Sequence, residues 1–288
     1  MNKVNTLTLN DSGYPAVLRD IPSPPKILNY IGAEPATWLG RPRVAVVGSR
    51  KASAYGAHAT KRIVSDLAAS GIVIVSGLAY GIDSIAHQAA LDSGGLTVAV
   101  LAGGLDSIYP AMHANLADNI LKTGGSIMSE YPAGTPSFKQ NFVARNRLVS
   151  GLADILLITE AAVNSGTMHT ARFALDQGKT VMAVPGNITS PGSEGCNNLI
   201  KSGAVPTTEA ADVFFALNLS PAKTTIRAPF KGSKQEAAIL ELIIEGINAQ
   251  EDLAIASNLD SSVFSSSLTM LEISGHIRPA GAGLWILA

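Results

Sequence analysis

The feature that most constrains the fold is an alternation of short apolar segments with longer amphipathic ones. Six apolar or β-branched runs recur, namely RVAVVG, GIVIVSG, TVAVLAG, SIMSEY, ADILLITE and TVMAVPG. Helical stretches separate them, such as YGAHATKRIVSDLAAS, IDSIAHQAALDSG, HANLADNILKTG and TMHTARFALDQG. Strands without polar alternation, each followed by a helix, indicate a parallel sheet covered on both faces. We therefore predict an α/β, Rossmann-like doubly wound domain, in which ligands bind beyond the carboxyl ends of the strands.

The regions on either side of this alternation have different patterns. Residues 1–40 are Pro-rich and weakly patterned, and we interpret them as a short N-terminal lead-in segment that packs against the Rossmann-like domain of residues 41–218. Residues 219–232 form a polar linker with prolines. Residues 233–288 contain three amphipathic helix candidates and two short strand-like pieces, which predict a small winged-helix domain, with Asp260 as the N-cap of its third helix.

Charge is unevenly spread along the chain. The whole sequence has 21 Lys and Arg against 22 Asp and Glu, a net charge of −1, so the protein as a whole has no nucleic-acid signature. The part from Lys231 to the C-terminus has 3 basic and 7 acidic residues, a net −4, which leaves +3 for the rest. We therefore expect any polyanion site in the larger part.

Cysteine usage and hydropathy indicate the compartment. Cys196 is the single cysteine, which excludes an intramolecular disulfide and fits a reducing environment. The N-terminus has no signal-peptide core, and no apolar run approaches the length needed to span a membrane. We expect a soluble, cytoplasmic protein without membrane association.

Four of the predicted strands run into loops suited to anions. Gly48-Ser49-Arg50 follows the first strand, Gly77 follows the second, and Gly103-Gly104 follows the third. Ser165-Gly166-Thr167 opens a helix whose N-terminus could hold a phosphate. The first loop does not match G-x-G-x-x-G, which argues against NAD. Each loop alone is a weak signal, but four on one sheet edge favour an anion site.

A cation-rich stretch, FKQNFVARNRLVSG, precedes the fifth strand. Arg145 and Arg147, on either side of Asn146, are two residues apart and cannot share a helix face. We expect one to meet the ligand and the other to brace the loop or a dimer contact. Lys139 suits a phosphate, and Phe142 either stacks on an unpaired base or packs under the loop.

Catalytic and metal sites have little support in the sequence. Asp83 and His87 are spaced i, i+4, and an N-cap beside a surface or interface histidine is favoured over a metal or acid–base pair. Glu160, after a strand, is the best acid–base candidate. Nucleotide hydrolases of the cytokinin-activating "lonely guy" group, which this fold resembles, need a Pro-Gly-Gly-x-Gly-Thr loop that the chain lacks. We predict no enzyme, metal or cofactor, and keep a phosphoribohydrolase-like nucleotide-binding enzyme as the alternative.

Seven segments between Tyr14 and Phe215 carry a family resemblance. They read YPAVLRDIPSPPKIL, VAVVGSRKASAYG, VSGLAYGIDSIAHQAAL, VLAGGLDSIYP, SEYPAGTPSFKQNFVARNRLVSGLAD, EAAVNSGTMHTARFAL and AVPGNITSPGSEGCNNLIKSGA. Together and in this order they resemble the DprA/Smf family of DNA-processing proteins. The resemblance implies a homodimer that binds and protects incoming single-stranded DNA and loads the RecA recombinase during natural transformation.

The resemblance also implies which residues form the DNA pocket. The implied set is Gly48, Ser49, Arg50, Lys139, Phe142, Arg145, Asn146 and Arg147, bordered by the loops at Gly77 and at Ser165-Gly166. Many family members have a helical domain where this chain has only the lead-in. The C-terminal unit resembles the family's winged helix, but its third helix contains no Lys or Arg. A helix that reads a DNA groove needs such donors, so we expect this unit to contact a protein or the Rossmann-like domain.

Overall fold

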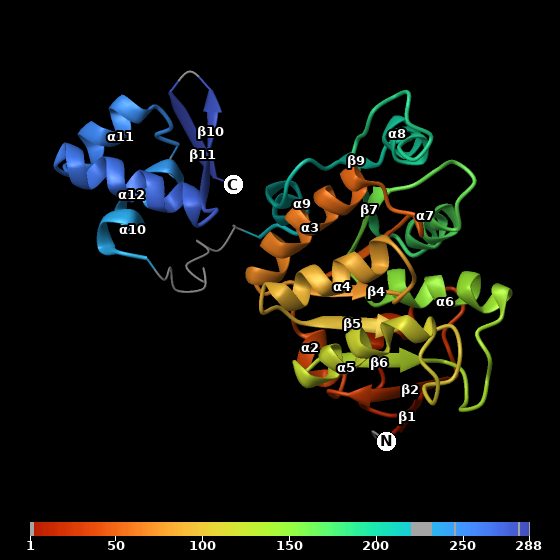
Figure 1. Cartoon of the computed structure of the whole chain (residues 1–288). Coiled ribbons are helices and arrows are strands. Elements are labelled where there is room, and N and C mark those ends of the chain that lie inside the picture. Colours follow the sequence, from red (N-terminus) through yellow and green to blue (C-terminus); the bar gives the residue numbers. More distant parts are fainter. Residues whose placement is uncertain (1–2, 220–231, 245, 282, 288) are drawn as a thin grey trace. The chain divides into compact units, whose positions relative to one another are not determined.

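A computed structural model describes residues 3–219, 232–244, 246–281 and 283–287. The chain divides into two units, one within Met1–Thr224 and the other within Thr225–Ala288. In Figure 1 the first is the α/β unit and the second is the small unit in blue. The predicted linker of residues 219–232 lies outside the described residues apart from its two ends.

A nine-stranded sheet forms the centre of the first unit. Its order is β1-β2-β6-β5-β4-β3-β7-β8-β9, and the strands from β3 to β9 run parallel. The bounds are β1 Asn5–Thr8, β2 Ile27–Gly32, β3 Arg43–Gly48, β4 Val73–Ser76, β5 Thr97–Val100, β6 Ser126–Ser129, β7 Ile155–Glu160, β8 Thr180–Ala183 and β9 Val205–Pro206. The six predicted strands are β3 to β8. The strand order reverses between β3 and β7, which makes the carboxyl ends of these strands the topological switch point.

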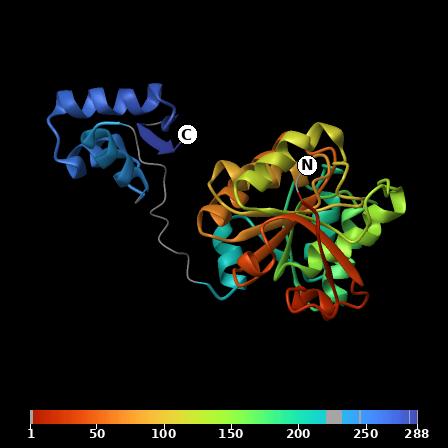
Figure 2. The same ribbon diagram turned by 90° about the horizontal axis from the view of Figure 1, so that it is seen from below.

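Helices cover both faces of this sheet, as Figure 2 shows. Their bounds are α1 Ala16–Arg19, α2 Ala36–Leu39, α3 Ala54–Ala69, α4 Ile82–Asp92, the 3-10 helix η1 Ala111–His113, α5 Ala114–Lys122, α6 Lys139–Gly151, α7 Thr167–Asp176, α8 Glu194–Lys201 and α9 Ala210–Ala216. Alternate residues of β3 enter separate cores, Ala45 and Val47 on the side of α6 and α7, and Val44 and Val46 on the side of α3 and α4. Because both faces are buried, the strands show no polar alternation, and the predicted doubly wound α/β fold is confirmed.

The first forty residues are more structured than their sequence indicates. We expected only a lead-in segment, whereas β1 and β2 extend the sheet antiparallel beyond β6. The buried Tyr14 fixes the segment between these strands, because its hydroxyl donates to the carbonyl of Pro25 over 2.7 Å. The strand β1, with the sequence NTLT, lies at the sheet edge and buries no residue fully. Such a short polar edge strand gives no hydrophobic signal in the sequence.

The cation-rich stretch also differs from expectation, because it forms the helix α6 where we expected a loop. Its inward positions include two polar side chains, Asn141 and Arg145, both buried. Since polar residues interrupt the apolar stripe, the usual periodicity of an amphipathic helix is lost. For this reason the helix α6 could not be predicted from the sequence pattern.

The second unit has the order of a winged helix, as predicted. Its elements are α10 Lys234–Ile244, α11 Gln250–Ser257, α12 Ser261–Ile273, and the antiparallel strands β10 Ile277–Gly281 and β11 Leu284–Leu287. A separate core includes Ile239, Leu253, Phe264 and Leu271. Asp260 stands at the N-cap position of α12, although its side chain makes no capping hydrogen bond.

Candidate functional site

A pocket of about 350 Å³ opens at the switch point, between the β3–α3 loop, the helix α6 and the β7–α7 loop. Nine of the eleven predicted site residues line it: Gly48, Ser49, Arg50, Lys139, Phe142, Arg145, Asn146, Ser165 and Gly166. They come together because β3 and β7 are neighbouring parallel strands whose carboxyl ends meet at one edge. The two predicted residues outside the lining are Gly77 and Arg147. Both contact protein groups next to the pocket.

Two cations at the pocket are exposed. Arg50 follows β3 and Lys139 begins α6, and both side chains are open to solvent. The guanidinium carbon of Arg50 lies 4.8 Å from the centroid of the Phe142 ring, within the range of a cation–π contact. Within the described residues neither cation forms an ion pair. Their charges therefore remain available to an anion that enters the pocket.

Arg145, by contrast, is 2% exposed. Its Nη1 donates to the carbonyl of Gly77 over 2.6 Å and also to the carbonyl of Val100. A Cβ atom at Gly77 would lie 2.5 Å from the Arg145 guanidinium, so this close approach requires glycine. Arg145 thus fastens α6 to the ends of β4 and β5 beneath the pocket.

The negative partner in this buried region is Asp83. Its carboxylate accepts hydrogen bonds from the backbone N–H of Gly77 (3.1 Å) and Ala79 (3.4 Å). Burial raises the pKa of Asp83, and the charge of Arg145 opposes that rise. Burial likewise lowers the pKa of Arg145 to about 10, and Asp83 opposes that fall. Gly81, and not Asp83 as we expected, is the N-cap of α4, so Asp83 instead organises the β4–α4 loop.

His87 corrects a second expectation, because it is completely buried and is not a surface or interface residue. Its Nδ1 lies 2.6 Å from the Oγ1 of Thr97, and its Nε2 has no hydrogen-bond partner among the described residues. Burial, helped by the charges of Arg145 and His113, lowers the pKa of His87 to about 3. The imidazole is therefore neutral near pH 7. Asp83 and His87 belong to no group of three or more side chains that could hold a metal, within the described residues.

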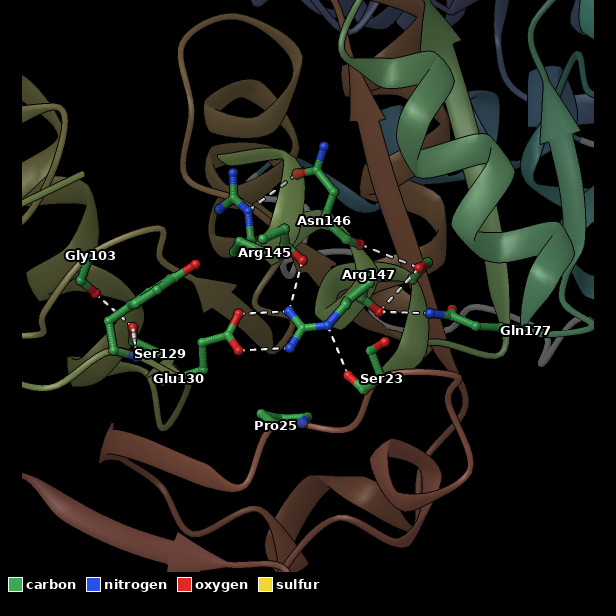
Figure 3. A network of polar contacts seen from close by, with 12 residues as sticks. Ser23, Pro25, Gly103, Ser129, Glu130, Arg145, Asn146, Arg147 and Gln177 are labelled. Carbon is green, nitrogen blue, oxygen red and sulfur yellow. Dashed lines mark hydrogen bonds and ion pairs between the residues drawn. The ribbon is translucent and has the colours of Figure 1, made fainter. Parts of the chain in front are cut away.

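Arg147 does not line the pocket, and Figure 3 shows its guanidinium between the side chain of Glu130 and the carbonyl of Ser23. Its two terminal nitrogens donate to the carboxylate of Glu130 over 2.6 and 2.7 Å, and its Nε donates to the carbonyl of Ser23 over 2.8 Å. In this structure both arginines hold protein groups, and Arg145, unlike Arg147, also lines the pocket. That one of them meets the ligand stays a prediction. The exposed cations beside the pocket are Arg50 and Lys139.

The helix α7 contributes its N-terminus to the pocket. Gly166 is the N-cap, and the hydroxyl of Thr167 donates to the carbonyl of Gly48 over 3.1 Å, which joins the β7–α7 and β3–α3 loops. The Oγ of Ser165 is buried and has no hydrogen-bond partner among the described residues. The partial positive charge of the helix N-terminus adds to that of Arg50 and Lys139.

Glu160, the acid–base candidate, makes a structural contact with the start of α3. It ends β7, is buried, and accepts a hydrogen bond from the backbone N–H of Ser53 over 2.8 Å. A Cβ atom at Gly56 would lie 2.4 Å from its Oε2. The carboxylate therefore lies against the first turn of α3, where a negative charge stabilises the helix.

Some residues around the site were not singled out in the sequence. Glu130 and Ser23 hold Arg147 from segments 17 and 124 residues away, and no local spacing indicates such contacts. Tyr109 lies beside Phe142, with ring centroids 5.6 Å apart and an angle of 62° between the rings. In the sequence, the one feature that could have pointed to Tyr109 is its position after the predicted Gly-rich loop at Gly103-Gly104.

The sequence profile of the family described as DNA recombination-mediator protein A matches residues 5–218. A second profile, the DprA winged helix domain, matches residues 221–283. Among the described residues, no helix combines the length and apolar character needed to cross a bilayer.

Relatives and solved structures agree with these profiles. The chain is 48% identical to Protein Smf of Escherichia coli over 171 residues, which cover 59% of this chain and 46% of that protein. It is 37% identical over 287 residues to a putative DNA processing protein DprA of Mycobacterium tuberculosis, with 94% and 74% covered. It thus spans less than half of the first relative and about three quarters of the second.

Two solved structures resemble the fold. DNA processing protein A of Streptococcus pneumoniae matches with a TM-score of 0.70 and 40% identity, over 74% of each chain. DNA processing protein A of Helicobacter pylori matches with a TM-score of 0.67 and 32% identity, over 76% of this chain and 98% of that one. The second structure is described as revealing a single-stranded DNA binding mode of that protein.

Proposed function

The chain belongs to the DNA recombination-mediator protein A family, and from this premise we propose that it binds single-stranded DNA in the pocket between β3, α6 and β7. The observation that carries the proposal is the pairing of two exposed cations, Arg50 and Lys139, with the aromatic ring of Phe142 at that pocket. Phosphates and unpaired bases need these two kinds of group. The single-stranded DNA binding of the H. pylori relative supports the same assignment.

The dimensions of the pocket favour a single strand over a duplex. Its volume of about 350 Å³ falls in the range of about 300–1,000 Å³ typical of small-ligand pockets, so it has room for a nucleotide-sized group. A base must be unpaired to enter such a pocket. Because the cations act on the phosphate backbone and carry no base code, binding should depend little on sequence.

A fluorescence-anisotropy titration tests the proposal. Labelled oligo-dT should bind more tightly than a duplex of equal length, with little difference between mixed sequences. Affinity should fall as salt is added, with a slope on logarithmic axes of about −0.7 for each phosphate neutralised. Absence of single-strand binding at low salt would contradict the proposal.

The wider role follows from the family. We propose that the protein acts in the cytoplasm as a homodimer, protects incoming single strands, and loads RecA recombinase during natural transformation. Light scattering should then give twice the mass of one chain. RecA ATPase activity on DNA coated with a single-strand-binding protein should rise when this protein is added. A monomeric mass would contradict the proposed homodimer, and an unchanged rate of ATP hydrolysis by RecA would contradict the proposed loading of RecA.

We further propose that the chain is not an enzyme. Glu160 lies against the first turn of α3, where its carboxylate accepts a hydrogen bond from the backbone of Ser53. This structural role accounts for the carboxylate without a catalytic function. Incubation with nucleoside monophosphates should release no free base, as followed by chromatography. Turnover that disappeared in a Glu160→Gln variant would establish the phosphoribohydrolase-like alternative instead.

A further inference from the structure

A half-exposed aromatic side chain lies just outside the pocket lining. Tyr109 lies between β5 and η1, and its side chain is 50% exposed. Its ring meets that of Phe142 edge to face, at 5.6 Å and 62°. Tyr109 therefore stands directly beside the aromatic residue of the pocket while remaining half open to solvent.

The ring of Phe142 is only partly open to a base. The guanidinium carbons of Arg50 and Arg145 lie 4.8 and 6.0 Å from its centroid, and the side chain is partly buried. Of the exposed aromatic side chains at this end of the sheet, which include Tyr80 and Phe138, Tyr109 is the one whose ring contacts Phe142. We propose that Tyr109 is a base-stacking platform, which takes the nucleotide next to the one whose phosphate Arg50 and Lys139 hold. This inference rests on the proposed single-strand binding.

The angle between the two rings predicts a preference among single strands. Two bases that lie against Phe142 and Tyr109 cannot be parallel, because the rings are inclined at 62°. The strand must therefore turn between these nucleotides and break the stacking of its own bases. Thymines stack weakly and adenines strongly, so a flexible pyrimidine strand turns at lower cost. The site should prefer oligo-dT to oligo-dA, by a modest factor.

A purely structural role for Tyr109 is the competing explanation, since the ring also packs the β5–η1 segment against α6. Substitutions separate the two roles. Tyr109→Phe keeps the aromatic face, whereas Tyr109→Leu keeps apolar bulk and removes the face. Tyr55→Leu is the matched control, because Tyr55 is also 50% exposed but lies at the start of α3, where its hydroxyl donates to the carbonyl of Pro185.

Anisotropy titrations of the full chain give the first test. Tyr109→Leu should weaken oligo-dT binding by about tenfold, the lower part of the range for one stacked base. It should also reduce the preference for oligo-dT over oligo-dA. Tyr109→Phe and Tyr55→Leu should stay within about twofold of the wild type. Equal affinity in Tyr109→Leu, or an equal loss in Tyr55→Leu, would overturn the proposal.

Photocrosslinking tests the same contact in the wild-type protein and needs no variant. Oligo-dT that carries 5-iodouracil should crosslink to a peptide containing Tyr109, as identified by mass spectrometry. Crosslinks confined to other peptides would overturn the assignment of Tyr109. Failure of the wild type to bind oligo-dT at all would instead remove the proposed function, so the two failures are distinguishable.

Discussion

The two units of this chain present different surfaces to a polyanion. In the first unit, Arg50 and Lys139 are exposed beside a pocket at the end of a parallel sheet. In the second unit, the helix α12 occupies the position of a winged-helix recognition helix, yet its exposed face carries the apolar residues Val263, Met270 and Ile273. The second part of the chain has a net charge of −4 and the first +3.

The fold of a unit therefore does not fix its ligand. A winged helix suggests duplex DNA by analogy alone. A recognition helix must supply donors for phosphates and bases, and α12 contains no Lys or Arg. An apolar face with acidic neighbours suits a protein surface. We therefore propose nucleic-acid binding for the first unit, and for the second a contact with a protein or with the Rossmann-like domain.

A related contrast exists inside the first unit, between cations that hold the fold and cations that face solvent. Arg145→Ala should cause the largest effect, a loss of about 3–5 kcal/mol in the unfolding free energy of this unit. The carbonyls of Gly77 and Val100 would lose their donor, and the buried carboxylate of Asp83 would lose its compensating charge. The second unit should unfold as before.

Denaturant unfolding followed by fluorescence measures this effect unit by unit. Trp38 is buried in the first unit and Trp285 lies in the second, so single-tryptophan variants report on each. Arg172→Ala is the control, because Arg172 is an exposed arginine in a long 3.9 Å ion pair with Asp176 on α7. If Arg145→Ala were no more destabilised than Arg172→Ala, Arg145 would not be a brace.

The stability of the first unit should also depend on pH in a way that comes from His87. The pKa of His87 is about 3 when folded and 6.5 as a free side chain, so below pH 6.5 the unfolded chain takes up a proton that the folded one does not. The first unit should therefore lose stability as the pH falls from 6.5 toward 3, by about 2–3 kcal/mol at pH 4.5. A His87→Asn variant should show a flatter dependence in its Trp38-monitored unfolding.

The carboxyl of Asp83 acts in the opposite direction. Its pKa is raised, so the folded state binds a proton before the unfolded state does, and stability rises as the pH falls through the folded pKa. This contribution is common to the wild type and His87→Asn, so the difference between the two pH profiles isolates His87. Parallel profiles between pH 7 and 4.5 would show that His87 takes up its proton in the folded state.

The exposed cations should change affinity and leave stability unaltered. Arg50→Ala and Lys139→Ala should each weaken single-strand binding by about fivefold to tenfold, or ~1–1.4 kcal/mol, on all sequences alike. Each should also reduce the salt slope by about 0.7. Lys61→Ala is the control, since Lys61 is exposed on α3 and does not line the pocket. A variant of Arg50 or Lys139 that bound like Lys61→Ala would place the site elsewhere.

The sequence predicted the parts of the fold and site that rest on repeated local patterns. Strands buried on both faces leave continuous apolar runs, so β3 to β8 could be found. Because parallel strands end at one edge, the loops at Gly48 and Ser165 could be expected to meet, and both line the pocket. The negative net charge of the C-terminal part could be counted directly from the sequence.

Other parts depend on contacts between distant segments and leave no local pattern. The helix α6 was hidden because the buried inward residues Asn141 and Arg145 are polar. Nothing near His87 in the chain indicates that Thr97, on the neighbouring β5, forms its hydrogen bond in the core. The Glu130 partner of Arg147 is likewise set by the tertiary structure. Burial thus decides which cations are free, and the sequence does not show burial of a charged residue.

We propose that single-strand binding resides in the first unit, and a chain without the second unit tests this. Anisotropy titrations with oligo-dT would compare the full chain with a chain that ends before Ser233, both checked for folding and mass. We predict affinities within about threefold, less than the ~1.4 kcal/mol of a tenfold change, because α12 offers no cation to a phosphate. A loss well beyond tenfold in a folded truncation of unchanged oligomeric state, or a gel shift of duplex DNA by residues 233–288 alone at moderate salt, would contradict it.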